Sequence, residues 1–135
     1  MSENGWKILK LPLVDVNSVN SLFVLDDLKP YIPSIKRVYF MCASDKGVKR
    51  GYHAHKKLNQ LIIVITGSYE FVLENQFGVK NTFLITAGEG LFIFKPVWRV
   101  FTSIDNNSSF ITLCSDHYDK DDYIRDYEEF KQGNY

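Results

Sequence analysis

Short apolar runs follow one another along most of the chain, and turn signals separate them. The runs occupy residues 21–27, 35–43, 58–67, 68–75, 81–90, 91–96, 98–104 and 108–116. They are rich in β-branched and aromatic residues, which favour strands. The segments "NQFG" and "DNNSS" between runs are typical of hairpin connections. Many short strands at this spacing predict an all-β antiparallel sandwich or barrel.

The last part of the chain has a different pattern. In "DDYIRDYEEFKQ", Ile124, Tyr127 and Phe130 recur at three-residue steps on an otherwise charged segment. This spacing places the apolar side chains on one face of a helix. We therefore expect a short C-terminal helix over residues 119–132, packed on the barrel, and a single domain over residues 1–135.

Composition and charge narrow the classes of function. The 135 residues include 16 basic and 16 acidic side chains, so no net charge draws the protein to nucleic acid or an anionic membrane. The N-terminus lacks a signal-peptide pattern, and no apolar run approaches the roughly 20 residues that span a bilayer. Cys42 and Cys114 are expected to be free thiols. These features indicate a soluble cytoplasmic protein.

The stretch "RGYHAHKK" contains two histidines, His53 and His55, one residue apart. On a strand such residues point to the same face, while Tyr52 and Ala54 point to the other. The two imidazoles can therefore converge on one cavity. Three interpretations start from this doublet: a pair of metal ligands, a pair that transfers protons, and two histidines packed in the core.

The spacing around the doublet reads G-x5-H-x-H-x4-Q-x6-G from Gly47 to Gly67. It resembles the first motif of the cupin family, which has glutamate where Gln60 stands. The run "GLFIFKP" gives G-x5-P spacing, and this resembles the start of the second cupin motif. The resemblance implies a cupin-type antiparallel β-barrel or jelly roll.

Two departures from the cupin pattern argue against a metal site. Gln60 is a neutral and poor ligand, and Arg99 occupies the region where the second motif supplies a histidine. Divalent first-row metals want three or more N, O or S donors, usually with a negative charge among them. We therefore expect no metal and no cofactor, which leaves proton transfer as the favoured role of His53 and His55.

Cationic and aromatic residues surround the doublet. They are Arg50, Lys56, Lys57, Trp98 and Arg99. Guanidinium groups hold phosphate well, and an aromatic face can stack on a base. A cavity of this composition suits an anionic substrate with a flat ring, such as a nucleotide diphosphate sugar.

The segments "RGYHAHKKLNQ", "PVWR" and "SDHYDKDDYIRDYEEF" together look like those of the nucleotide-sugar 3,4-ketoisomerases. The resemblance implies an isomerase that converts dTDP-4-keto-6-deoxyglucose to a 3-keto sugar through an enediol. It implies a metal-independent enzyme of deoxysugar biosynthesis, supplying 3-amino or 3-acetamido sugars for surface polysaccharides such as lipopolysaccharide and lipooligosaccharide. It also implies a homodimer that exchanges the N-terminal strands, within residues 1–20.

The same resemblance implies roles for individual residues. His55 would be the main base, His53 its partner, and Tyr39 an assisting group. Substrate binding would fall to Arg50, Lys56, Trp98 and Arg99. Some members of the family have histidine where Arg99 stands, and Arg99 could here stabilise an enediolate because it stays protonated. The configuration of the product at C4 stays open.

Three other functions fit parts of the sequence. A cupin epimerase also uses histidine and enolisation. A non-catalytic sugar-binding cupin would keep the cations and aromatic residues but would not need both histidines. A metal-dependent dioxygenase would require the ligands that Gln60 and Arg99 replace.

Overall fold

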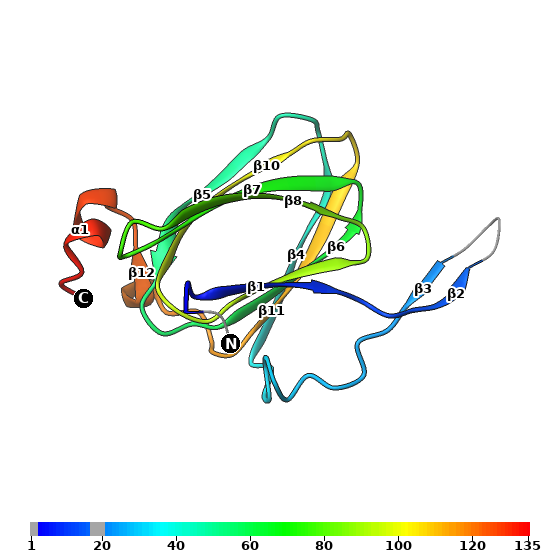
Figure 1. The fold of residues 1–135 in the computed structure, drawn as a ribbon, viewed down its shortest axis with the longest axis horizontal. Helices are drawn as coiled ribbons and strands as arrows, with labels where there is room; N and C mark the ends of the chain where they lie inside the picture. The colour runs from blue at the N-terminus through cyan, green and yellow to red at the C-terminus, as the bar shows by residue number, and fades with distance from the viewer. Residues whose placement is uncertain (1–2, 17–20) are drawn as a thin grey trace.

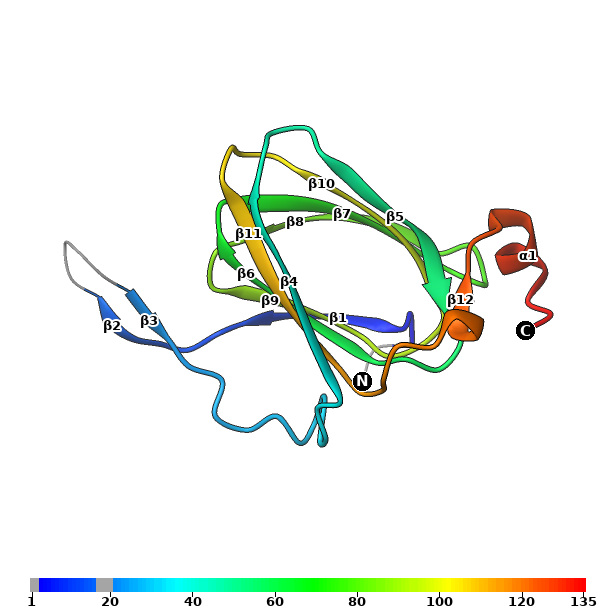
Figure 2. The same ribbon diagram turned by 180° about the vertical axis from the view of Figure 1, so that it is seen from behind.

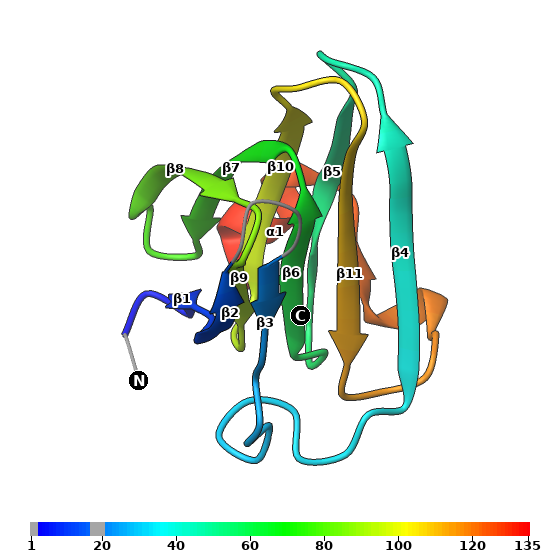
Figure 3. The same ribbon diagram turned by 90° about the vertical axis from the view of Figure 1, so that its right-hand side faces the viewer.

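Two five-stranded antiparallel sheets face each other in the computed structural model, which describes residues 3–16 and 21–135 (Figure 1). The first sheet has the order β1-β9-β6-β11-β4, visible in Figure 3, and the second has the order β12-β5-β10-β7-β8. The strands are β1 (Trp6–Lys10), β2 (Leu13–Val16), β3 (Ser21–Phe23), β4 (Arg37–Ser44), β5 (Lys49–His55), β6 (Gln60–Thr66), β7 (Ser68–Asn75), β8 (Lys80–Thr86), β9 (Glu89–Ile93), β10 (Val97–Ser103), β11 (Ser108–Cys114) and β12 (Tyr123–Ile124). The predicted all-β, cupin-type jelly roll is confirmed.

Alternation of side chains along the strands builds the core between the sheets. On β7, Tyr69, Phe71 and Leu73 are buried, while Glu70 between them is exposed. This period of two is the pattern of a strand with one face in a core. The main apolar cluster joins these side chains to others from both sheets, namely Trp6, Ile62, Val64, Ile85, Leu91, Ile93, Val97 and Phe110.

The C-terminal segment is divided into three short elements rather than one helix. A 3₁₀ turn (Lys120–Asp122) comes first, β12 follows, and only Tyr127–Gln132 forms the helix α1. The prediction of a helix over 119–132 is therefore wrong for its first half. The side chain of Asp119 caps the 3₁₀ turn, that of Asp126 caps α1, and the strand between them pairs with β5. These caps and this pairing outweigh the helical spacing.

Helix α1 packs on the outer face of the second sheet, at one end of the barrel (Figures 1 and 2). Phe130 and Ile124 are buried there against Ala54 and Trp98. Lys131 and the hydroxyl of Tyr127 both bind Glu74 on β7. The segment that carries β12 is thus fixed to the barrel by apolar and polar contacts.

The hairpin formed by β2 and β3 extends away from the two sheets (Figure 1). Its apolar side chains Leu13, Leu22 and Phe23 are exposed. Strand β1, by contrast, pairs with β9 of the same chain. Residues 1–2 and 17–20 of the predicted N-terminal strand region lie outside the described residues. No helix in the described part of the chain is long and apolar enough to cross a membrane.

Candidate active site

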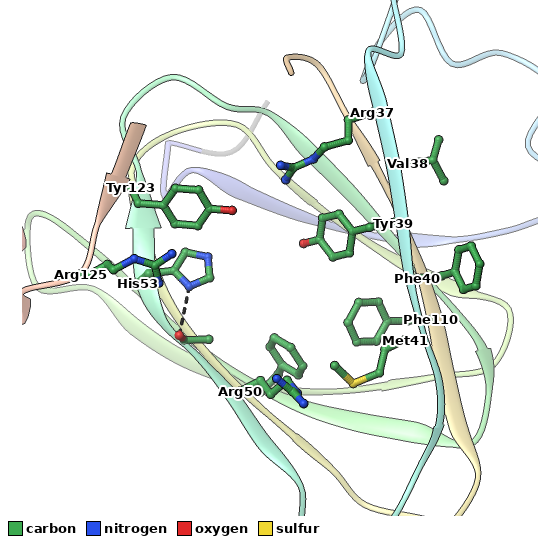
Figure 4. Close-up of a pocket in the computed structure, with 12 residues that line it drawn as sticks. Arg37, Val38, Tyr39, Phe40, Met41, Arg50, His53, Phe110, Tyr123 and Arg125 are labelled. Carbon is green, nitrogen blue, oxygen red and sulfur yellow. Dashed lines mark hydrogen bonds between the residues drawn. The ribbon is translucent and has the colours of Figure 1, made fainter. Parts of the chain in front are cut away.

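A cavity of about 470 Å³ opens between the two sheets, with His53 on one side and β4 on the other (Figure 4). It is lined by Arg37, Val38, Tyr39, Phe40, Met41, Arg50, Gly51, His53, Phe101, Phe110, Tyr123 and Arg125. The lining combines guanidinium groups, phenol hydroxyls and an imidazole. These are groups that can bind an anion and move a proton.

His53 is the histidine that faces the cavity. Its Nδ1 lies 3.0 Å from the carbonyl oxygen of Gly51, which can only accept a hydrogen bond. Nδ1 therefore carries the hydrogen, and Nε2 of the neutral ring keeps a free lone pair. Burial, and then the nearby charge of Arg99, lower the pKa of His53 to about 4. At neutral pH the ring is thus an unprotonated base.

His55 lies behind His53, with the two ring centroids 4.9 Å apart. Only 2% of His55 is exposed, and its Nδ1 donates to Oδ2 of Asp122 over 3.0 Å. Burial and the charge of Arg99 also lower the pKa of His55. Its Nε2 is buried and has no hydrogen-bond partner among the described residues. The doublet thus converges as predicted, but only His53 lines the cavity.

Asp122 is a site residue that sequence reasoning missed. It belongs to the 3₁₀ turn, is buried, and accepts the backbone N–H of Lys57 with its second carboxylate oxygen. With one carboxylate oxygen fixed by Lys57 and the other bonded to Nδ1 of His55, Asp122 holds His55 in one tautomer and one orientation. The signal available in the sequence was the tail block "SDHYDKDDYIRDY", in which Asp122 is one of several acidic residues.

Arg99, a predicted binding residue, is only 3% exposed and does not line the cavity. It is the register partner of His53 across β10 and β5, and its guanidinium donates to Oε1 of Gln60 and to the carbonyl oxygen of Val97. Nε2 of Gln60 donates in turn to the hydroxyl of Tyr39 over 3.0 Å. Burial lowers the pKa of Arg99 to about 10, so the guanidinium remains charged at neutral pH.

Three arginines, Arg37, Arg50 and Arg125, line the cavity (Figure 4). Arg37 lies over the ring of Tyr39, at 5.2 Å from its centroid, and Arg125 lies over the ring of Tyr123, at 4.3 Å. Arg50 was predicted from the sequence, and Arg37 and Arg125 were not. Arg37 could have been found by the same rule as the histidines, because it is two residues before Tyr39 on one strand.

Two further predicted binding residues, Trp98 and Lys56, also lie outside the cavity lining. Trp98 does not line the cavity but packs under α1, with its ring 5.8 Å from that of Phe130. The reason is the strand period, because Arg99 points into the barrel and its neighbour must point out. The side chain of Lys56 is exposed outside the cavity, and its backbone N–H binds the carbonyl oxygen of Asp122.

Within residues 3–16 and 21–135, no group of three or more histidine, cysteine, aspartate and glutamate side chains is placed to hold a metal ion. The two free cysteines are separated, with Cys42 exposed and Cys114 buried. The side chains at the site supply imidazole, phenol, carboxylate and guanidinium groups.

Comparison with known proteins gives a consistent result. The family FdtA, described as "WxcM-like, C-terminal", matches residues 4–134. A TDP-4-oxo-6-deoxy-alpha-D-glucose-3,4-oxoisomerase from Aneurinibacillus thermoaerophilus is 33% identical over 117 residues, which cover 87% of this chain and 84% of the relative. A 3,4-ketoisomerase structure from Helicobacter canadensis is 35% identical, with a TM-score of 0.81 and coverage of 95% and 96%.

A further solved structure is a variant of the 3,4-ketoisomerase QdtA from Thermoanaerobacterium thermosaccharolyticum in complex with TDP-4-keto-6-deoxyglucose. It is 30% identical, with a TM-score of 0.83, and the match covers 98% of this chain and 95% of that one. The family match spans nearly all of the described barrel and its tail. The chain therefore belongs to the FdtA family.

Proposed function

We propose that the protein is a sugar-nucleotide 3,4-ketoisomerase that acts on dTDP-4-keto-6-deoxyglucose. The observation that carries the proposal is the free Nε2 of His53, which faces a cavity lined by three arginines and two tyrosines. Relatives of the protein are named as 3,4-ketoisomerases or 3,4-oxoisomerases, and the structure of one contains this keto sugar. No step of the proposed reaction requires a metal ion or an organic cofactor.

The reaction moves a ketone by relocating two protons, one from C3 to C4 and one from the C3 oxygen to the C4 oxygen. The C4 carbonyl acidifies the proton on C3, and a base removes it while the C3–H electron pair forms a C3=C4 double bond. The C4 oxygen takes a proton, which gives an enediol. The C3 hydroxyl then loses its proton, C4 gains one, and the product has its ketone at C3 and its hydroxyl at C4. A neutral base and an oxyanion stabiliser are sufficient for these steps.

The geometry supports a different division of roles between the histidines from the one expected from the sequence. His53 presents Nε2 to the cavity, so we assign it the removal of the C3 proton. His55 is held by Asp122 behind it and would pass protons or fix the position of His53. The charge of buried Arg99 would stabilise negative charge that develops on the enediolate.

Tyr39 and the arginines complete the proposed substrate site. The hydroxyl of Tyr39 points into the cavity and is the candidate donor to the oxygen on C4 (Figure 4). Arg37, Arg50 and Arg125 would bind the pyrophosphate, because a guanidinium donates two parallel hydrogen bonds to phosphate oxygens. The proposed cytoplasmic location and the surface-polysaccharide pathway follow from this type of substrate.

We further propose that the protein forms a homodimer by exchange of N-terminal strands, and that the exchanged segment is the hairpin β2–β3, which begins within the expected residues 1–20 and ends at Phe23. The hairpin and the outer face of the first sheet border an apolar groove of about 750 Å³, lined partly by Leu11, Leu22, Phe23, Ile63 and Leu113. Exposed apolar surface of this kind marks interaction sites. Light scattering should give a dimer, and Leu22→Lys should weaken it, while Leu84→Lys on β8 should not. A monomer at micromolar concentration would contradict this.

The decisive experiment is incubation of the protein with dTDP-4-keto-6-deoxyglucose in heavy water, followed by NMR. Migration of the ketone, with deuterium incorporated at C4, is the expected result, and the coupling pattern at C4 gives the configuration of the product. Deuterium exchange without ketone migration would indicate an epimerase instead. Binding without exchange would indicate a sugar-binding protein.

The variants His53→Asn and His55→Asn test the assigned roles in the same assay. We expect His53→Asn to abolish C3 exchange, and His55→Asn to slow it by about 10²-fold or more, the usual contribution of a proton-transfer group. Full turnover by both variants would exclude the proposed catalytic role of the doublet.

A further inference from the structure

Gln60 connects the buried cation of the site to the phenol that lines the cavity. Only 1% of Gln60 is exposed, and it contacts Arg99 with one end of its amide and Tyr39 with the other. A guanidinium has only donors, so the amide atom that faces Arg99 must be the oxygen. The NH₂ group must then face Tyr39. Arg99 thus fixes the orientation of the Gln60 amide.

This orientation decides which way the hydrogen of Tyr39 points. The hydroxyl of Tyr39 accepts a hydrogen bond from Nε2 of Gln60, so its own hydrogen is free to be donated elsewhere. The buried hydroxyl of Thr112, the register partner of Tyr39 on β11, lies beside the phenol and can donate to it, as Gln60 does. With both partners donating, the hydrogen of Tyr39 is directed into the cavity, where Figure 4 shows the Tyr39 hydroxyl.

A glutamate at this position would reverse the arrangement. Its carboxylate would pair with Arg99 and could only accept from Tyr39, which would turn the phenol hydrogen away from the substrate. Among the described residues, no carboxylate forms an ion pair with Arg99. The amide therefore leaves Arg99 without a carboxylate in direct contact and leaves the phenol hydrogen available.

We propose that Gln60 is a positioning residue for the isomerisation: held by Arg99, it orients Tyr39 as a hydrogen donor toward the oxygen on C4 of the substrate. This inference rests on the proposed function, since it assigns a partner to the developing enediol oxygen. It also gives a chemical reason for the amide where the cupin motif has a carboxylate.

The test is a double-mutant cycle of Gln60→Glu and Tyr39→Phe, read as kcat and KM for ketone migration. Turnover is measured at about pH 8, where both histidines are neutral, so that a change in the field of Arg99 does not alter their charge. Gln132→Glu, at an exposed position on α1, adds the same charge away from the cavity and serves as the control. Thermal melts establish that each variant is folded.

We expect Gln60→Glu and Tyr39→Phe each to lower kcat by at least about tenfold, with KM changed by less than about threefold. Because both act through one phenol hydrogen, the double variant should match Tyr39→Phe alone within about threefold. Losses that multiply in the double variant would overturn the inference, as would full activity of Gln60→Glu. If Gln60→Glu does not fold, Gln60→Met, which removes the amide without adding a charge, takes its place in the same cycle.

The activity of the unaltered protein distinguishes an error in the proposed function from an error in the role of Gln60. If the unaltered protein does not move the ketone of dTDP-4-keto-6-deoxyglucose, the proposed function is wrong and the role of Gln60 is wrong with it. If the unaltered protein is active and the two substitutions act independently, only the positioning role is excluded.

Discussion

Oδ2 of Asp122 lies 3.0 Å from Nδ1 of His55, and the two side chains are 6% and 1% exposed. The two residues are 67 positions apart in the chain. The contact joins the tail to β5, where β12 pairs with His55 and Ala54. An imidazole held by a carboxylate has a fixed tautomer, which leaves its other nitrogen ready to accept a proton.

Asp122→Asn should therefore impair catalysis more than folding. The amide can still bond to Nδ1 of His55, but it no longer fixes which nitrogen carries the hydrogen. We expect kcat to fall by about 10- to 100-fold, with a smaller change in KM. Steady-state kinetics measure the loss, and ¹⁵N NMR of the imidazoles reports the tautomer. Asp121→Asn, next to it but exposed, should behave like the unaltered protein.

As the pH is lowered, activity should be lost only at pH values below the ordinary pKa of histidine. His53 must be neutral to act as a base, and its pKa is lowered to about 4 by burial and by Arg99. The pH profile of kcat/KM should thus be flat from about pH 8 to about pH 5. Arg99→Met removes the cation and should move the acid limb to higher pH. An acid limb near pH 6.5 in the unaltered protein, the ordinary value, would contradict this.

The lowered pKa of His53 also makes the free energy of unfolding depend on pH. Between the ordinary histidine pKa, 6.5, and the folded value, about 4, the unfolded chain binds a proton at His53 that the folded chain does not. The unfolding free energy should therefore fall as the pH falls through this interval, and His53 should make no contribution to this dependence above it. Urea unfolding of the unaltered protein and of His53→Asn, compared across this range, measures the contribution of this residue.

Gly51 and Gly47 form a matched pair for a test of backbone packing. Both have positive φ, +103° and +88°, so alanine meets similar backbone strain at each position. At Gly51 a Cβ would lie 2.5 Å from the carbonyl oxygen of Arg99, whereas at Gly47 it would meet nothing within 4 Å. We expect Gly51→Ala to lose at least about 2 kcal/mol more unfolding free energy in urea than Gly47→Ala. Equal losses would show that the β5–β10 contact adapts.

Phe130 should anchor the tail on the barrel. It is fully buried, against Trp98 and other apolar side chains. Phe130→Ala should cost about 3–5 kcal/mol of unfolding free energy, as other large-to-small changes in cores do. Activity should fall with it, because the same segment carries Asp122 and Tyr123. Phe77→Ala, at a side chain that is 80% exposed, should change stability by less than about 0.5 kcal/mol.

The parts of the site that could be predicted follow from the two-residue period of a strand. That period brings His53 and His55 together, and it would also have paired Arg37 with Tyr39. It equally sends adjacent side chains to opposite faces of a strand, so Trp98 and Arg99 could not both point into the barrel. Polarity alone would place the apolar Trp98 inside the barrel and the charged Arg99 outside it. The structure has the reverse, with Arg99 inside and Trp98 under α1.

The parts that could not be predicted depend on where the tail returns. The three-residue spacing of Ile124, Tyr127 and Phe130 fits a helix, but β5 offers an unpaired edge that Tyr123 and Ile124 fill instead. Pairing between segments so far apart in the chain leaves no local trace in the sequence. The role of Asp122 therefore becomes visible only when the fold is known.

The position of β12 has a consequence for the order in which the ribosome makes the protein. Strands β1 to β11 are synthesised before residues 119–132, and they already contain both sheets except for this short edge strand. A nascent chain can therefore close its barrel while it still lacks Asp122, Tyr123 and Arg125. Translation must pass these residues before the site is complete, so a product truncated before them would lack both the tail's site residues and the apolar contacts of Ile124 and Phe130 with the barrel.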